Sequence, residues 1–234
     1  MSIQAKNIVK SFHNGTRDQV VLNDVSLTIN DGEFLMVIGR SGAGKSTLLY
    51  QMGLLDHPTS GTVILGDIDT GKLGHAERTR LRLTELGYIF QDYALVPELT
   101  ASENVMIPLL MKGNSPKEAK AKALEALVKV GIGTKDQNLP SQLSGGEQQR
   151  VSVARAIADK PKIVFADEPT ANLDTENAQR IIDLFMDLNR AGQTIVMVTH
   201  EEEYTKLAHR VVTLRDGKIL SIEEYRPLAT KLSR

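Results

Sequence analysis

The segment "GRSGAGKST", residues 39–47, most constrains the fold of this chain, because it satisfies the pattern G-x-x-x-x-G-K-[ST]. It follows the apolar run "FLMVI" from Phe34 and precedes the helix-like "STLLYQM". A glycine-rich loop between a buried strand and a helix turns backbone N–H groups toward an anion at the positive end of the helix. The segment therefore predicts an α/β fold with a phosphate-binding loop after one strand.

The residues of this loop differ in what they contribute to phosphate binding. Glycines let the backbone approach phosphate oxygens, Lys45 neutralises the terminal phosphates, and Ser46 is a ligand for Mg²⁺. The alternative, a glycine-rich turn that only caps a helix, is disfavoured by the strand and helix on either side. The candidate phosphate-binding residues are Gly39, Arg40, Ser41, Gly42, Ala43, Gly44, Lys45, Ser46 and Thr47.

Further apolar runs predict the rest of a sheet. They are "YIF" from Tyr88, "IVFA" from Ile163, "IVMV" from Ile195 and "VVTL" from Val211. Continuous apolar runs are typical of parallel strands that helices bury on both faces. Asp216-Gly217 predicts a hairpin after the last run, and the first thirty or so residues favour short antiparallel strands.

A long stretch between these strands, about residues 97–160, reads as mostly helical. "SPKEAKAKALEALVKVG" has Ser115 as N-cap, Glu118 closing a capping box and Gly131 as a stop. A second helix follows "LSGG" to about Asp159, and a third is expected in "TENAQRIIDLFMDLNRAG". The apolar "VMIPLL", residues 105–110, is expected to be loop-like and to pack or to dock another protein.

Two carboxylates follow the predicted strand "IVFA". Asp167 and Glu168 emerge at its carboxyl end, where ligands bind in open α/β sheets. Neighbouring strand residues point in opposite directions, so we expect two separate roles. Asp167 is the better candidate for holding Mg²⁺, and Glu168 for polarising a water that attacks the γ-phosphate. The alternative is a pair of acids that only begin a loop.

Two more polar residues stand at strand ends. His200 ends "TIVMVTH", where a γ-phosphate contact can be made, although a lone histidine is more often a surface or core residue. Gln91 follows "YIF" and can ligate Mg²⁺ or water, but its position alone is a weak signal.

The segment "LSGGEQQR", residues 143–150, resembles a second phosphate turn. Ser144 and Glu147 form an S-x-x-E capping box, so a well-capped helix is the plain interpretation. Gly145 and Gly146 at the first helical positions each cost up to about 1 kcal/mol relative to Ala. That cost favours close approach of a phosphate to the backbone, but the residues alone do not say whether both turns share one nucleotide.

Composition excludes several other classes. With 28 Lys+Arg against 29 Asp+Glu, no Trp and 4% aromatic residues, the chain offers no basic field or stacking platform, and we expect no nucleic-acid partner. Zero Cys excludes disulfides and thiolate metal sites. We find no run of about 18 apolar residues and no signal-peptide core, so we expect a soluble, unexported chain.

Taken together, these motifs make the chain resemble an ATP-binding-cassette (ABC) ATPase along its whole length. "GRSGAGKST", Gln91, "LSGGEQQR", "FADEPTANLD" and His200 carry the resemblance. "GLLDHPTSG", "FQDYALVPELTASENVMIPLL" and "ADEPTANLD" make it most similar to the ATPase subunits of the lipoprotein-releasing, macrolide-export and cell-division group.

The resemblance implies a head-to-tail dimer of two copies with two ATP between them. Phe12 would stack on adenine, at a position where Tyr is commoner. The "LSGG" turn would bind the partner's γ-phosphate, Asp174 would align the two sites, and His200 would contact the γ-phosphate as a switch. The residues implied to act across the dimer are Ser144, Gly145, Gly146, Glu147 and Asp174.

The implied function is ATP hydrolysis with Mg²⁺ that energises a separate integral membrane permease subunit, from a peripheral position on the cytoplasmic inner face of the membrane. Gln91 would relay to that subunit near the helical lobe. The expected division is a nucleotide-binding core (residues 1–91 and 161–225), a helical subdomain (92–160) and a C-terminal tail (226–234). The alternatives are a soluble ABC ATPase acting on DNA or ribosomes, and a GTP-dependent switch, for which we find no N-K-x-D motif.

Overall fold

The computed structural model describes residues 1–13, 15 and 17–225, which form two compact units. The first unit comprises Met1–Gly71 and Thr194–Arg234, and the second comprises Lys72–Gln193. The second unit includes two strands and two helices from the range expected for the nucleotide-binding core, so these units follow other bounds than the expected core and helical subdomain, which stay a prediction. The expected tail, residues 226–234, lies outside the described residues.

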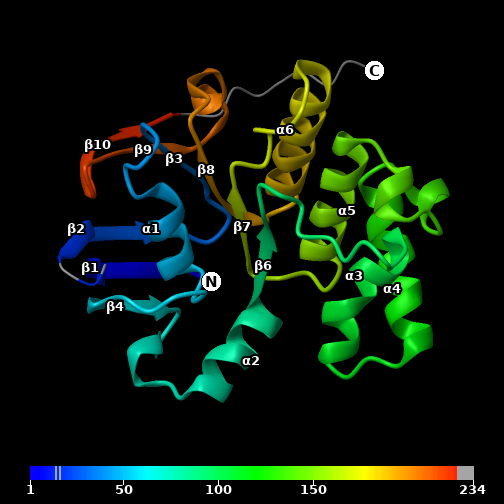
Figure 1. Cartoon of the computed structure of the whole chain (residues 1–234), viewed down its shortest axis with the longest axis horizontal. Helices are drawn as coiled ribbons and strands as arrows, with labels where there is room; N and C mark the ends of the chain where they lie inside the picture. The colour runs from blue at the N-terminus through cyan, green and yellow to red at the C-terminus, as the bar shows by residue number, and fades with distance from the viewer. Residues whose placement is uncertain (14, 16, 226–234) are drawn as a thin grey trace. The chain divides into compact units, whose positions relative to one another are not determined.

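An antiparallel sheet opens the first unit, as expected for the first thirty residues (Figure 1). It has the order β2-β1-β4-β5, so two strands that the sequence did not reveal extend it. Apolar side chains such as Ile3, Ala5 and Ile8 are buried. The strands are β1 Ile3–His13, β2 Asp18–Ile29, β4 Ser60–Leu65 and β5 Ile68–Asp69.

Four more strands of the first unit follow the order β10-β9-β3-β8. Strand β3 runs parallel to β8 and β9, and β10 returns antiparallel to β9 through the predicted turn at Asp216 and Gly217, both with positive φ. Helix α1, Lys45–Met52, packs on β8, β1 and β2. The strands are β3 Phe34–Ile38, β8 Thr194–Thr199, β9 Arg210–Arg215 and β10 Lys218–Glu224.

The second unit is mostly helical. Strands β6, Leu86–Ile89, and β7, Ile163–Asp167, run parallel. Helices α3, α4 and α5 pack against one another, and α5 also packs on β6 and α6. The helices are α2 His75–Glu85, α3 Ala101–Met111, α4 Pro116–Lys129, α5 Gly145–Ile157 and α6 Thr175–Arg190, and the short 3₁₀ turns of the chain are η1 Thr70–Lys72, η2 Gly133–Lys135, η3 Pro140–Gln142 and η4 Glu202–Leu207.

Residues 105–110 correct one expectation, because they are helical and not loop-like. They lie in α3, which begins at a capping box of Thr100 and Glu103 and contains Pro108. The T-x-x-E pattern was present in the sequence, but the proline within the apolar run favoured a loop. The three helices predicted after residue 114 are confirmed, with Ser115 and Glu118 forming the expected box.

Asp159 joins three helices of the second unit, and we predict that this junction contributes to stability. Lys112 of α3 and Lys122 of α4 each place Nζ 2.7 Å from an Asp159 oxygen, just beyond α5. Partial burial opposes ionisation of Asp159, but the two lysines outweigh it and lower its pKa. Asp159→Asn is therefore expected to reduce the free energy of unfolding by about 1 kcal/mol at neutral pH.

The pH dependence of this effect has a definite sign. A carboxylate with a lowered pKa in the folded protein stabilises it above its usual pKa, and this contribution is lost as pH falls through the folded value. Urea denaturation at pH 7 should separate Asp159→Asn from wild type, and the difference should shrink as pH falls below about 3.9, the usual pKa of aspartate. Asp67→Asn, in an exposed turn of the first unit, is the control. An equal effect of both substitutions would contradict the prediction.

Candidate functional site

The glycine-rich loop leaves β3 after Ile38 and enters α1 at Lys45. Gly39, Gly42 and Gly44 have φ of 151°, 78° and 98°, in the region that favours glycine. A Cβ on Gly39 would lie 2.2 Å from the carbonyl oxygen of Leu214, and one on Gly44 would lie 2.9 Å from that of Val21. Both glycines are thus required by close backbone neighbours as well as by backbone conformation.

Lys45 folds back over this loop. Its side chain is buried, and its Nζ donates to the carbonyl of Gly39 at 3.0 Å. The first turn of α1 reads Lys-Ser-Thr-Leu, with Ser46 second, so no carboxylate compensates the positive end of the helix. A cation, a hydroxyl and a helix N-terminus are therefore gathered beside one curved loop, which suits a polyphosphate.

His200 leaves the sheet at the same edge as the glycine-rich loop. In the parallel pair β3–β8, Ile38 lies opposite Thr199, so both chain segments turn out of the sheet at one level. The Glu201 N–H donates to the Thr199 hydroxyl at 3.0 Å and fixes the turn around the exposed His200. The first unit thus brings together two of the predicted groups.

Asp167 and Glu168 lie at the end of β7 in the second unit. Asp167 is buried, and Glu168 follows with φ of 43°, a left-handed conformation that is costly for a non-glycine residue. In the parallel pair β6–β7, Ile89 lies opposite Ala166, so Gln91 leaves the same edge two residues after Ile89. Strain of this kind clusters at functional sites, and no pattern in the sequence indicated it.

The "LSGG" turn is the N-terminus of α5. The Glu147 N–H donates to the Ser144 hydroxyl at 3.3 Å, and the Ser144 N–H donates to the Glu147 carboxylate at 2.9 Å, which confirms the capping box. A Cβ on Gly146 would lie 2.6 Å from the Asn177 side chain, and one on Gly145 would lie 3.0 Å from the Tyr93 hydroxyl. Packing inside the second unit is thus a reason for both glycines that sequence reasoning missed.

Asp174 begins the next helix beside this turn. Its carboxylate accepts from the Asn177 N–H at 2.9 Å and from the Asn177 side chain at 2.7 Å, and these bonds lower its pKa. Asn177 also borders Gly146. Asn177 therefore lies between Asp174 and the "LSGG" turn and adjoins both.

Two polar side chains of α5, those of buried Gln149 and half-buried Arg155, also support the site, and sequence reasoning missed them. Gln149 donates to the carbonyl of Pro169 at 2.7 Å, which ties the "LSGG" helix to the turn after Glu168. Arg155 donates to the carbonyls of Tyr93 and Ala94 at 2.9 and 2.5 Å. Polar residues on the inner face of a helix were the available signal.

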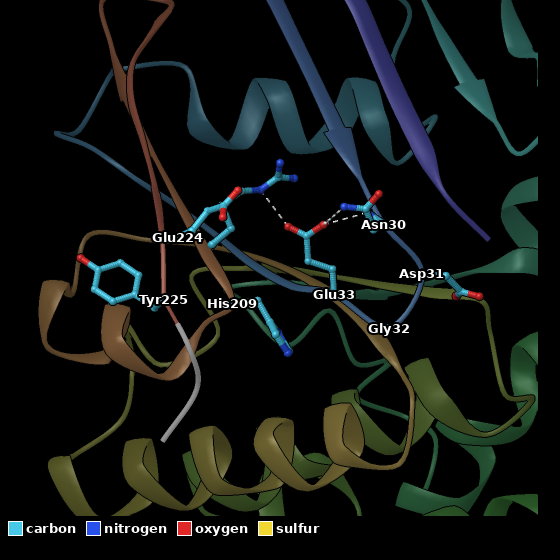
Figure 2. A pocket seen from close by; sticks show the side chains of 8 residues that line it. Asn30, Asp31, Gly32, Glu33, His209, Glu224 and Tyr225 are labelled. Atoms are coloured by element: carbon cyan, nitrogen blue, oxygen red, sulfur yellow. Dashed lines mark hydrogen bonds and ion pairs between the residues drawn. The ribbon is translucent and has the colours of Figure 1, made fainter. Parts of the chain in front are cut away.

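A polar pocket of about 520 Å³ lies at the other end of β3, and the predicted site residues do not line it. Figure 2 shows Glu33 beside Asn30. Nε of Arg210 lies 2.9 Å from the Glu33 carboxylate. The Phe34 N–H donates to Nδ1 of His209 at 3.0 Å. These contacts brace the start of β3, so His209 has a structural role.

Residues 22–171 match the family described as "ABC transporter". The chain belongs to the ABC transporter family. It is 47% identical to the lipoprotein-releasing system ATP-binding protein LolD of Aquifex aeolicus, over 93% of this chain and 96% of LolD. It is 41% identical to the macrolide export ATP-binding/permease protein MacB of Burkholderia pseudomallei, over 93% of this chain and 33% of MacB.

A solved structure supports the fold of this ABC cassette. The ATP-binding cassette MJ0796, in a dimeric post-hydrolysis state bound to ADP and Pi, superposes with a TM-score of 0.89 and 39% identity, over 96% of this chain and 99% of MJ0796. The predicted α/β fold with an N-terminal antiparallel sheet is confirmed. The ABC protein described here is an ATP-binding, ATP-hydrolysing subunit.

The predicted site residues of this ABC ATPase fall into two groups. The glycine-rich loop, Phe12 and His200 lie in the first unit. Gln91, Asp167, Glu168, the "LSGG" turn and Asp174 lie in the second. Among the described residues, no helix has both the length and the apolar character needed to cross a membrane.

Proposed function

We propose that two copies of this ATPase close head to tail over two ATP molecules and that hydrolysis drives a separate integral membrane subunit. The observation that carries the proposal is the match over 96% of the chain to a cassette whose structure is dimeric and bound to ADP and Pi. In this proposal the glycine-rich loop and Phe12 of one copy hold ATP, and the "LSGG" turn of the other copy covers the γ-phosphate.

Hydrolysis would depend on a carboxylate at the end of β7. We assign the attacking water to Glu168, which would accept its proton, with His200 contacting the γ-phosphate and Gln91 holding water nearby. The left-handed backbone of Glu168 supports this assignment, because it directs the chain out of the strand direction immediately after buried Asp167.

The donor groups assigned to Mg²⁺ fit that ion. Ser46 offers a hydroxyl, Asp167 a carboxylate and Gln91 an amide oxygen, and Mg²⁺ prefers such oxygen ligands together with substrate phosphates and water. Buried Asp167 suits a cation, because ionised carboxylates away from water need a positive partner. When bound, Mg²⁺ would neutralise charge on the β- and γ-phosphates.

The residues assigned to act across the dimer are those of the α5 N-terminus and Asp174. Ser144, Gly145, Gly146 and Glu147 form the first turn, where N–H groups and the helix dipole favour an anion. Asn177 donates to Asp174 and borders Gly146, so a shift of this turn would change the position of Asp174.

A groove on the second unit supports docking of a membrane subunit. The groove encloses about 380 Å³ between α2, β6, α3 and α5, and its lining includes Leu83, Tyr88, Phe90, Ile107 and Met111. Charged side chains, among them Arg82 and Lys112, also line it. An apolar trough with a charged border suits an amphipathic helix. We assign this groove to a cytoplasmic helix of the membrane subunit, which places the ATPase on the inner face of the membrane.

The proposed system performs export or envelope-related transport, such as lipoprotein release or drug or peptide efflux, and the names of two relatives, the lipoprotein-releasing LolD and the macrolide exporter MacB, support this proposal. The alternative, a soluble ABC ATPase acting on DNA or ribosomes, is disfavoured by the balanced charge of the chain.

A matched pair of variants tests the membrane partner. Met111 of α3 is 66% exposed at the groove, and Val128 of α4 is 67% exposed outside it. Met111→Glu should abolish co-purification of an integral membrane protein from detergent-solubilised membranes, because a buried carboxylate at the interface is unfavourable. It should leave basal ATP hydrolysis unchanged, and Val128→Glu should behave as wild type. Recovery of only ribosomal or DNA complexes would favour the alternative.

A further inference from the structure

Lys10 of β1 is a charged residue that faces inward. Its side chain is only 12% exposed, and its Nζ lies 2.7 Å from Oδ2 of Asp56 and 2.8 Å from the carbonyl oxygen of His57. The same Nζ lies over the ring of Phe12, 4.9 Å from the centroid. Lys10 is thus held by the chain itself and is not extended toward solvent to attract a ligand.

Phe12, in contrast to Lys10, is exposed to solvent. Its side chain is 43% exposed near the end of β1. An ammonium on one face of an aromatic ring attracts the ring electrostatically, typically by about 0.5–1 kcal/mol at exposed sites. Lys10 therefore restrains an exposed ring that would otherwise sample several rotamers.

The Lys10–Asp56 pair also connects this ring to the phosphate loop. Asp56 accepts from Nε2 of Gln51 at 3.0 Å, and Gln51 is fully buried on α1, the helix that begins with Lys45. Burial opposes ionisation of Asp56, but hydrogen bonds from Lys10, His57 and Gln51 outweigh it and lower its pKa. Asp56 is therefore ionised at neutral pH.

Strand β1 is also tied to the segment that follows α1. The Thr59 N–H donates to the carbonyl of Val9 at 2.8 Å, and the Ser11 N–H donates to the Thr59 hydroxyl at 3.0 Å. The backbone on both sides of Lys10 is thus fixed relative to the segment that follows α1.

We propose that Lys10 is a positioning residue for nucleotide binding, which connects the Phe12 ring to Asp56 and, through Asp56, to Gln51 of α1, so that the ring meets an adenine at a fixed distance from the phosphate loop. The proposal rests on the assignment of Phe12 to adenine stacking. A ring restrained before binding loses less conformational entropy when the base arrives, so the restraint increases affinity for the base and not for the phosphates.

The first test separates base from phosphate. Lys10→Met removes the charge and keeps the aliphatic stem, and Lys10→Arg keeps a cation. By calorimetry, Lys10→Met should weaken ADP binding about two- to fivefold, the equivalent of one exposed cation–π contact. Pyrophosphate, which has no base, should bind as to wild type. Lys10→Arg should restore most of the ADP affinity.

The second test uses the aromatic residue. In a Phe12→Leu background, Lys10→Met should have no further effect on ADP affinity, because the ring it restrains is gone. The chain has no Trp, so Phe12→Trp introduces a single tryptophan at the site, which can be excited selectively over the tyrosines. Its fluorescence anisotropy without nucleotide should fall when Lys10→Met is added, which reports loss of the restraint.

The outcomes separate two hypotheses. If Phe12→Leu leaves ADP affinity unchanged, the stacking assignment itself is wrong. If Phe12→Leu weakens ADP binding but Lys10→Met does not, only the role of Lys10 is wrong. Equal weakening of ADP and pyrophosphate by Lys10→Met would show general damage to the unit and would also overturn the proposal.

Discussion

Glu168→Gln is expected to slow ATP hydrolysis by about 10²–10⁴-fold, the usual effect of losing a general base. Glutamine matches the size of glutamate but accepts no proton from an attacking water. ATP binding should persist, because the assigned phosphate-binding groups are in the glycine-rich loop. The variant should therefore accumulate as an ATP-bound dimer. Phosphate release measures the rate, and size-exclusion chromatography with and without ATP measures the dimer.

The control for this experiment is Glu125→Gln, on the exposed face of α4, which should hydrolyse ATP at the wild-type rate. Turnover near the wild-type rate by Glu168→Gln would remove Glu168 from the reaction. Loss of ATP binding by the same variant would instead indicate damage to the turn after β7, where Glu168 has positive φ.

Mixing two inactive variants is expected to restore activity if the site is shared between copies. Lys45→Ala removes the cation of the glycine-rich loop. Ser144→Asp keeps an equally good N-cap for α5 but places a negative charge beside the partner's γ-phosphate. Each variant alone should lose about 10²-fold or more of its hydrolysis rate. A mixed dimer then has one intact site and one site with both defects.

An equimolar mixture should recover about a quarter of the wild-type rate, because about half of the dimers are mixed and each has one intact site. Ser144→Asn, a neutral cap, should retain more activity than Ser144→Asp, which separates charge repulsion from loss of capping. A mixture no faster than the mean of its two components would contradict the shared site.

Much of the fold follows from local patterns. The apolar runs at Phe34, Ile163 and Ile195 became buried strands, and the capping box at Ser115 began a helix at the next residue. Helix α2 and the short β5 were missed, because a mostly polar helix and a two-residue strand leave little periodicity to detect. Residues 105–110 were expected to be loop-like because they include Pro108, but α3 accommodates this proline.

The site was predicted less completely than the fold. Motifs indicated which residues bear charge and where strands end, and this was sufficient to predict that Asp167 ends β7 and that His200 follows β8, whereas their roles stay predictions. They did not indicate the left-handed backbone of Glu168 or the contacts of Gln149 and Lys10, because such features depend on which distant segments meet. A tertiary contact between residues far apart in sequence has no local pattern.

The close backbone neighbours of the glycine-rich loop also affect how nucleotide binding begins. The Gly217 N–H, from the β9–β10 turn, donates to the carbonyl of Ala43 at 3.1 Å, and Gly39 and Gly44 abut the backbone of Leu214 and Val21. These contacts lie within the first unit and hold the loop in its curved conformation. In the proposed dimer, a loop held in this way needs little reorganisation to bind nucleotide, so most of the binding energy is available for drawing the second copy onto the bound nucleotide.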